Sequence, residues 1–181
     1  MKPIKPADCI YWARPINRPS FIPQSRPRGA KAAGLRYERK FAEYLKPLGV
    51  LHGQWFEFED KSGIRYCQTD IIFPLSLRLF ALMEIKYTLT DRAYDQLLDL
   101  YGPVVEAAYN TRCGLVTVFK NTRTDYDRSA YQYDIQSACQ WSIDTGGVGL
   151  LRWVGQPIVK EPNSRLSSIL GTIKEGQSAR G

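Results

Sequence analysis

The sequence predicts an α/β protein in which helices flank a mixed central sheet, with an extended basic arm at the N-terminal end. A segment with helical periodicity near residue 34 is followed by three strand-like segments, a second helical segment and a further apolar strand. An apolar fraction of 44% in a chain of 181 residues is enough for one hydrophobic core. We therefore expect one domain over residues 34–160, between an arm at 1–33 and a loose tail at 161–181.

The arm is expected to be extended because proline, which supplies no amide donor to a helix, recurs throughout ARPINRPSFIPQSRPRGAK. Residues 1–40 carry a net charge of +8, whereas the other 141 residues carry −1. An arginine-rich segment with interspersed aromatic rings favours binding to a polyanion that carries phosphates and bases. The residues expected to bind nucleic acid are Arg14, Arg18, Arg26, Arg28, Lys31, Arg36 and Arg39. The alternative is an arm that binds nothing in particular, or that docks on its own domain.

The composition excludes several kinds of active site. His52 is the only histidine, which excludes multi-histidine metal centres, and we interpret it as an incidental loop residue rather than a sole general base. The four cysteines form no C-x-x-C pair, so neither a zinc ribbon nor an iron–sulfur cluster is expected. Hydrolysis by this chain would depend on carboxylates, lysine and a metal ion.

No segment of the sequence is typical of a membrane protein or a secreted one. No window approaches the roughly 18 consecutive apolar residues of a membrane span. The N-terminal end also lacks the continuous apolar segment of a secretory signal. We therefore expect no membrane contact and a cytoplasmic location, in the host cytoplasm if a phage encodes the chain.

The first expected helix spans residues 34–46. At about 100° per residue, Leu35, Phe41 and Leu45 fall on one apolar arc. Glu38 falls inside the same arc. A carboxylate that faces the core is costly unless it is paired or bound to a cation, so Glu38 is a candidate site residue.

Three strand-like segments follow the helix. They are residues 53–60, 63–73 and 76–89, the first two being joined by a turn. Glu84 and Lys86 lie two apart in the third segment and project from one face, which Asp70 in the second can reach if the strands are neighbours. Gathered carboxylates repel one another, and Mg²⁺ or Mn²⁺ relieves that repulsion. A lysine beside the ion can orient or help deprotonate an attacking water.

The remaining segments complete the expected sheet. A helix over residues 90–101, capped by Thr90, is expected to continue past the following Gly-Pro with a break or kink there. It leads to a strand at 113–120 beside the Glu84 strand. A polar loop follows, and residues 137–143 and 149–155 are interpreted as added strands.

A second acidic-x-Lys triplet, Glu59-Asp60-Lys61, serves as a comparison. It falls at the predicted turn between the first two strands and has no aspartate on a preceding strand. We interpret it as a solvated loop.

The order of Glu38, Asp70 and the triplet Glu84-Ile85-Lys86 resembles that of the PD-(D/E)XK nuclease superfamily, over roughly residues 34–120. The resemblance implies a restriction-endonuclease-like αβββαβ core. One departure is Thr69, which stands where the family name has proline.

The resemblance also implies roles for individual residues. Asp70, Glu84 and the backbone carbonyl of Ile85 would bind Mg²⁺ or Mn²⁺, and Glu38 would join the metal shell. Lys86 would assist the water, and Gln96, on the helix after the Glu-x-Lys strand, matches a glutamine that many members carry. An ion pair of Glu84 with Lys86, with Asp70 tied to an arginine, is the structural alternative.

The expected function is that of a metal-dependent deoxyribonuclease. A compact domain with a basic arm resembles a structure-directed endonuclease, such as a Holliday junction resolvase or a small phage-type enzyme acting on branched DNA. Such resolvases act as homodimers, although the sequence shows no dimer seam. The alternatives are a DNA-binding or phage structural protein that keeps the fold without cleavage, and a nuclease directed at RNA.

Overall fold

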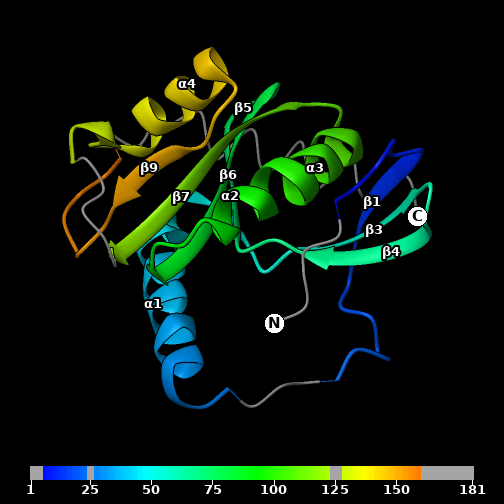
Figure 1. The fold of residues 1–181 in the computed structure, drawn as a ribbon, viewed down its shortest axis with the longest axis horizontal. Helices are drawn as coiled ribbons and strands as arrows, with labels where there is room; N and C mark the ends of the chain where they lie inside the picture. Colours follow the sequence, from blue (N-terminus) through cyan, green and yellow to red (C-terminus); the bar gives the residue numbers. More distant parts are fainter. Residues whose placement is uncertain (1–5, 24–26, 123–127, 160–181) are drawn as a thin grey trace.

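The computed structural model describes residues 6–23, 27–122 and 128–159 of the chain. These residues form an α/β fold with a mixed sheet flanked by helices, as the sequence predicts (Figure 1). Within them, a larger sheet has the strand order β2-β5-β6-β7-β9-β8, and a smaller antiparallel sheet has the order β1-β3-β4. No helix in the described part is long and apolar enough to cross a membrane.

The strands of the larger sheet are β2 (Leu51–His52), β5 (Ile71–Ser76), β6 (Leu79–Thr88), β7 (Arg112–Asn121), β8 (Tyr131–Gln132) and β9 (Gly149–Arg152). The smaller sheet consists of β1 (Trp12–Ile16), β3 (Trp55–Asp60) and β4 (Gly63–Gln68). The helices are α1 (Gly29–Leu45), α2 (Arg92–Gln96), α3 (Gly102–Tyr109) and α4 (Ile135–Thr145). Shorter helical segments are η1 (Lys46–Leu48), the π-helix η2 (Leu97–Tyr101) and η3 (Arg128–Ala130).

Strand β6 lies in the middle of the larger sheet because it is apolar on both faces. It pairs antiparallel with β5 and parallel with β7, and β9 and β8 continue in the parallel direction. Helices α1 and α4 contribute to the core on one face, around Met83 and Ile85. The segment from α2 to α3 contributes to the core on the other face, around Leu82. Burial on both faces explains the nearly continuous apolar sequence of β6.

Helix α1 begins at Gly29, five residues before the expected start, so residues 29–33 belong to the helix and not to the arm. Pro27 is the last proline before Pro47, so no proline interrupts a helix between these two positions. The helix buries Phe41 and Leu45 against the sheet, as the periodicity predicts.

Part of the arm docks on the domain. Residues of β1 are extended, as expected, but they pair antiparallel with β3, from Trp12 opposite Glu59 to Ile16 opposite Trp55. The indole Nε1 of Trp12 also donates a hydrogen bond to Glu59 Oε2 at 2.5 Å. This pairing corresponds to the docking alternative for the arm.

The expected strand at residues 63–73 is two strands, which belong to different sheets. Strand β4 closes a hairpin with β3, and the chain then passes through Thr69 and Asp70 into β5 of the larger sheet. The backbone at this junction is held by hydrogen bonds from Thr69 N to Gln54 O at 3.0 Å and from Gly53 N to Asp70 O at 2.8 Å. Asp70 therefore precedes β5 instead of lying within a strand.

The interpretation of residues 137–143 as a strand is wrong, because they lie in helix α4. Asp134 caps this helix by accepting a hydrogen bond from Ser137 N at 2.7 Å, and Gly146 ends it in the left-handed conformation. The buried residues Ile135, Ala138 and Cys139 follow helical spacing, and the interpretation as a strand did not take this spacing into account. Strand β9 is also shorter than the expected 149–155.

The sequence predicts a break or kink at Gly102-Pro103, and the helix is not broken there. Helical backbone runs from Arg92 to Tyr109, and a π-helical segment immediately precedes Gly102. Gly102 N donates to Leu97 O, five residues earlier, which accommodates the missing amide donor of the proline. The predicted cap by Thr90 is wrong, since the residue at the N-cap position of α2 is Asp91.

Candidate functional site

Several predicted site residues meet near the carboxyl end of β6. Glu84 and Lys86 project from the same face of the strand because they are two positions apart. Ile71 pairs with Met83, so Asp70, one residue before β5, lies beside Glu84 and Ile85. Asp70 Oδ2 accepts a hydrogen bond from the backbone N–H of Ile85 at 2.7 Å.

Glu84 is a buried carboxylate that lacks a complete set of partners. Its residue is only 2% exposed. The ammonium of Lys86 contacts Glu84 Oε1, whereas Oε2 has no hydrogen-bond partner in the described structure. Burial raises the pKa of Glu84, and the charge of Glu38 adds to that rise. The ammonium of Lys86 and the neighbouring carboxyl group of Asp70 oppose it.

Asp70 lies in an unfavourable electrostatic environment for a carboxylate. Burial raises its pKa well above the ordinary value, and the neighbouring carboxylates of Glu84 and Glu38 raise it further. The ammonium of Lys86 and the N–H of Ile85 oppose the shift without cancelling it. A buried carboxyl group whose pKa is raised by two neighbouring carboxylates forms a site that a bound cation would stabilise.

Helix α1 brings Glu38 to this group of carboxylates. The Glu38 side chain is 21% exposed, so it lies at the margin of the site rather than in the core. His52 Nε2 lies 3.0 Å from Glu38 Oε1. The only histidine of the chain, which the sequence led us to regard as incidental, is therefore in contact with a predicted site residue.

Sequence reasoning missed His52 because nothing in its local pattern distinguishes it from a loop residue. It lies in the two-residue strand β2 and pairs with Ile71, which directly follows Asp70. A strand of two residues has no recognisable periodicity. The only available signal was that the single histidine of the chain lies between the expected helix and the first strand-like segment.

Gln96 reaches the site from the opposite direction, at the end of α2. Its Oε1 accepts a hydrogen bond from Lys86 Nζ at 3.2 Å, and its Nε2 donates one to the hydroxyl of Tyr101 at 2.9 Å. Lys86 is consequently held between Glu84 and Gln96. Its side chain is 25% exposed, so its ammonium remains open to solvent on one side.

The donor set fits a hard divalent cation. Within residues 6–23, 27–122 and 128–159, no three His, Cys, Asp or Glu side chains are already arranged as a metal cluster. The fit rests on the unpaired buried Oε2 of Glu84 and on the raised pKa of Asp70. The N–H and C=O of one strand residue point to the same side, so the carbonyl of Ile85 faces the edge where Asp70 lies. Carboxylate and carbonyl oxygens are the ligands that Mg²⁺ and Mn²⁺ prefer.

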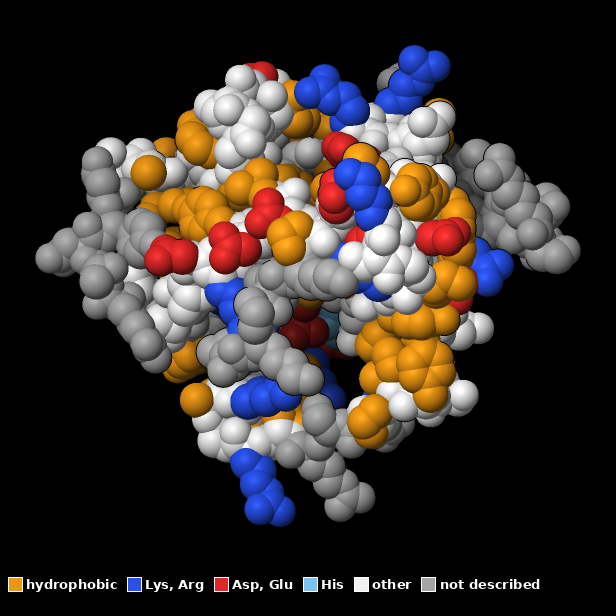
Figure 2. Space-filling view, turned by 45° about the vertical axis from the view of Figure 1, so that its right-hand side comes forward, with side chains coloured by type: hydrophobic (Ala, Val, Ile, Leu, Met, Phe, Trp, Pro, Cys, Tyr) orange, Lys and Arg blue, Asp and Glu red, His pale blue; other side chains and the backbone are white. Residues whose placement is uncertain are grey.

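The space-filling view places this region in a hollow (Figure 2). The pale blue histidine lies there beside a recessed red carboxylate, in agreement with the contact between His52 and Glu38. Blue lysine and arginine side chains surround the opening. Basic side chains at the margin give the opening of this hollow a positive charge.

The residues predicted to bind nucleic acid are divided between two elements. Helix α1 and its N-cap expose Arg28, Lys31, Arg36 and Arg39. Arg14 lies in β1, where its guanidinium is paired with Glu57, and exposed Arg18 donates to the carbonyl of Ile22 at 3.0 Å. Arg26 lies outside the described residues.

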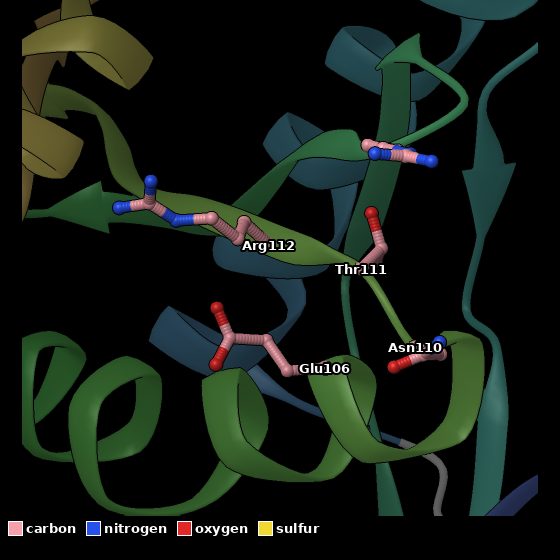
Figure 3. Close-up of a pocket in the computed structure, with 5 residues that line it drawn as sticks. Glu106, Asn110, Thr111 and Arg112 are labelled. Carbon is pink, nitrogen blue, oxygen red and sulfur yellow. The ribbon is translucent and has the colours of Figure 1, made fainter.

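A separate pocket of about 550 Å³ lies at the other end of β6 and β7 (Figure 3). Arg78, Glu106, Asn110, Thr111 and Arg112 line it. The carboxylate of Glu106 accepts a hydrogen bond from Cys113 N at 2.8 Å and so supports the start of β7. None of the predicted site residues lines this pocket.

Comparison with known proteins does not assign the chain to a family. No protein-family model, no curated protein and no solved structure matches it.

Proposed function

We propose that this protein is a metal-dependent nuclease that hydrolyses phosphodiester bonds of DNA. The observation that carries the proposal is the convergence of Asp70, Glu84 and Lys86 at one end of β6, with one oxygen of the buried Glu84 unpaired. Unsatisfied buried carboxylates are rare in a purely structural role because each one lowers stability.

The arrangement of secondary structure supports the finer assignment to a restriction-endonuclease-like core. In chain order, helix α1 is followed by β2, β5 and β6 of the larger sheet, by the helical segment from α2 to α3 and by β7, and β2, β5, β6 and β7 are neighbours in that sheet. This order agrees with the one that the resemblance to PD-(D/E)XK nucleases implies. The exposed basic residues of α1 are consistent with DNA as the substrate.

Four groups would hold the metal ion, which would be Mg²⁺ or Mn²⁺. Asp70, Glu84 and the carbonyl of Ile85 are the direct candidates, with Glu38 at the margin. When bound, such an ion lowers the pKa of water and neutralises charge on the phosphoryl group.

The side chains around these donors would position the reactants. Gln96 holds the ammonium of Lys86 toward the open side of the site, where it can donate a hydrogen bond to an attacking water or a phosphoryl oxygen. The hydrogen bond from Ile85 N fixes the orientation of the Asp70 carboxylate. His52 restrains Glu38 in the same way.

The first test is cleavage of supercoiled plasmid in Mg²⁺ by the wild type and by Lys86→Ala. Loss of a positioned proton donor lowers rates by about 100-fold or more, and we expect a loss of that size with DNA binding retained. Lys61→Ala, which removes the lysine of the other triplet, is the matched control and should cleave like the wild type. Equal cleavage by Lys86→Ala and the wild type would overturn the proposal.

A panel of substrates tests the finer assignment. We propose a structure-directed endonuclease of the phage type, which would cut flap or four-way-junction DNA in preference to linear duplex or single strands. Labelled RNA in the same panel tests an RNA-directed nuclease, and light scattering tests the homodimer. Binding without cleavage of any member would favour a non-catalytic DNA-binding or phage structural protein.

A further inference from the structure

Cationic side chains at the carboxyl end of the parallel strands lie on aromatic rings. Lys120 Nζ, from β7, is 5.1 Å from the ring centroid of Tyr87. Lys40 Nζ, from α1, is 5.9 Å from the ring centroid of Trp153. We call Lys40, Lys120 and Arg152 with these two rings the cation–aromatic surface. Contacts of this kind hold a flexible cationic side chain in one place, so its charge is presented at a defined position.

The rings beneath these cations are themselves fixed. Tyr37 packs edge-on against Tyr87 at a centroid distance of 6.0 Å and lies 5.8 Å from the ring of Trp153. Its hydroxyl donates a hydrogen bond to Trp153 O at 2.8 Å. Arg152 joins the group because its Nε donates to Lys120 O at 3.2 Å. The surface is therefore ordered without a bound partner.

The charges of this surface are not neutralised by the protein. Among the described residues, none of its three cations contacts a carboxylate. Other cations of the chain do have such partners: Arg14 pairs with Glu57, Arg65 with Asp60 and Lys61 with Asp8. Because Lys40 and Arg152 are exposed and Lys120 is partly exposed, a polyanion could reach all three.

The cation–aromatic surface adjoins the candidate site at the carboxyl end of the parallel strands. Tyr87 follows Lys86 in β6 and therefore projects from the opposite face of the sheet, so the two regions are connected through the row of positions at the strand ends. Phe119 pairs with Lys86 on one side and with Arg152 on the other, so these positions follow one another across β6, β7 and β9. Adjacent strands are about 4.8 Å apart, so the length of this row of positions on β6, β7 and β9 is comparable to the distance that a few phosphates span along a DNA strand.

We propose that the cation–aromatic surface binds the sugar–phosphate backbone of the DNA strand adjacent to the candidate site. This inference rests on the proposed function, because it takes the substrate to be DNA. It assigns substrate binding to Lys40, Lys120 and Arg152, which the sequence did not single out. Phosphate binding here would position the strand across the carboxyl ends of β6, β7 and β9, where open α/β sheets commonly bind ligands.

The test compares two triple variants with the same change in charge. The first is Lys40→Gln, Lys120→Gln and Arg152→Gln. The control is Lys46→Gln, Arg78→Gln and Arg112→Gln, which removes exposed cations elsewhere, two of them from the pocket in Figure 3. Fluorescence anisotropy with a labelled DNA duplex, in EDTA and over a range of salt concentrations, measures binding without cleavage.

We expect the first variant to bind at least about tenfold more weakly than the control at 0.1 M salt. Its plot of log affinity against log salt should lose about 0.7 to 0.9 in slope for each phosphate contact removed. Affinity and slope equal to those of the control would overturn the inference, as would a wild type that does not bind DNA.

A third variant separates charge from packing. Lys40→Arg, Lys120→Arg and Arg152→Lys keep the charges and should bind within about threefold of the wild type, since phosphate contacts depend on charge. Weak binding by this variant, with an unchanged melting temperature, would contradict a charge-based role. Failure of this inference is distinct from failure of the proposed function. If the protein binds DNA through this surface but does not cut it, the inference holds and the proposed function fails. If it cuts DNA and all variants bind equally, the proposed function holds and the inference fails.

Discussion

The two acidic-x-Lys triplets of this chain differ in how their buried carboxylates are satisfied. Asp60 and Glu84 are both 2% exposed. Asp60 Oδ1 accepts a hydrogen bond from Ser62 N at 2.7 Å, and its Oδ2 contacts the guanidinium of Arg65. Glu84 has Lys86 on one oxygen and no hydrogen-bond partner on the other in the described structure. Burial alone therefore does not distinguish a structural carboxylate from a candidate ligand, but the set of partners does.

The pKa values of the two buried carboxyl groups, Asp60 and Glu84, are shifted in opposite directions. Burial would raise the pKa of Asp60, but the hydrogen bonds from Ser62 and Arg65 outweigh it and lower that pKa. The pKa of Glu84 is raised instead, because burial outweighs Lys86. Ionisation of Asp60 therefore stabilises the fold. Ionisation of Glu84 destabilises it unless a cation compensates the charge.

The largest effect that would separate the two triplets is on cleavage. We expect Glu84→Gln to lower Mg²⁺-dependent DNA cleavage by about 100-fold or more, because a neutral amide is a poor ligand for a hard cation. Mg²⁺ should also raise the melting temperature of the wild type and not that of Glu84→Gln, since an ion that binds the native state stabilises it.

Glu59→Gln is the matched control in the other triplet and should leave both measurements unchanged. If Glu84→Gln cleaved normally and still gained stability from Mg²⁺, Glu84 would be a structural residue like Asp60.

The second effect concerns stability. Asp60→Asn should lower the free energy of unfolding by about 2 to 3 kcal/mol, because it leaves Arg65 without its buried carboxylate partner. Because the pKa of folded Asp60 lies below that of the unfolded chain, its contribution is present above about pH 4 and is lost as the pH falls through the folded value. Denaturant unfolding of the wild type and Asp60→Asn, from roughly pH 3 to pH 7, measures the difference in their free energies of unfolding.

Cleavage should be unaffected by this change, which makes it the complement of Glu84→Gln. A stability difference that did not shrink at low pH would show that the carboxylate charge of Asp60 contributes nothing.

The smallest expected effect is that of His52. Its contact with Glu38 restrains a residue at the margin of the metal site, so His52→Ala should lower kcat by about tenfold, the size expected for losing one positioning hydrogen bond. The melting temperature should stay within a few degrees of the wild type, since His52 is in a two-residue edge strand.

His52→Gln retains a hydrogen-bonding group and should recover part of the activity. An unchanged kcat in His52→Ala would return His52 to the role of an incidental residue.

Several features of the site could be read from the sequence because they depend on local periodicity. Glu84 and Lys86 share a face since strand side chains alternate, and Gln96 reaches Lys86 from the helical segment that follows. The paired strands around them were also predictable from apolar segments. The strand assigned to residues 137–143 was wrong because a short apolar segment is compatible with either periodicity, and the cap at Asp134 was overlooked.

Other features depend on contacts between distant segments. Asp60 was expected to be solvated, yet Arg65 and the docked N-terminal segment cover it, with Lys61 N donating to Asp8 O at 3.3 Å. The position of His52 beside Glu38 likewise depends on how β2 and α1 meet.

The sequence by itself determined the α/β class and the alternation that places Glu84 and Lys86 together. These follow from local hydrophobic periods, which each segment carries regardless of its neighbours. The tertiary structure alone decided which buried carboxylate would be satisfied. That outcome depends on whether the fold places a hydrogen-bond donor from a distant segment next to each carboxylate oxygen, and no local sequence pattern specifies this placement.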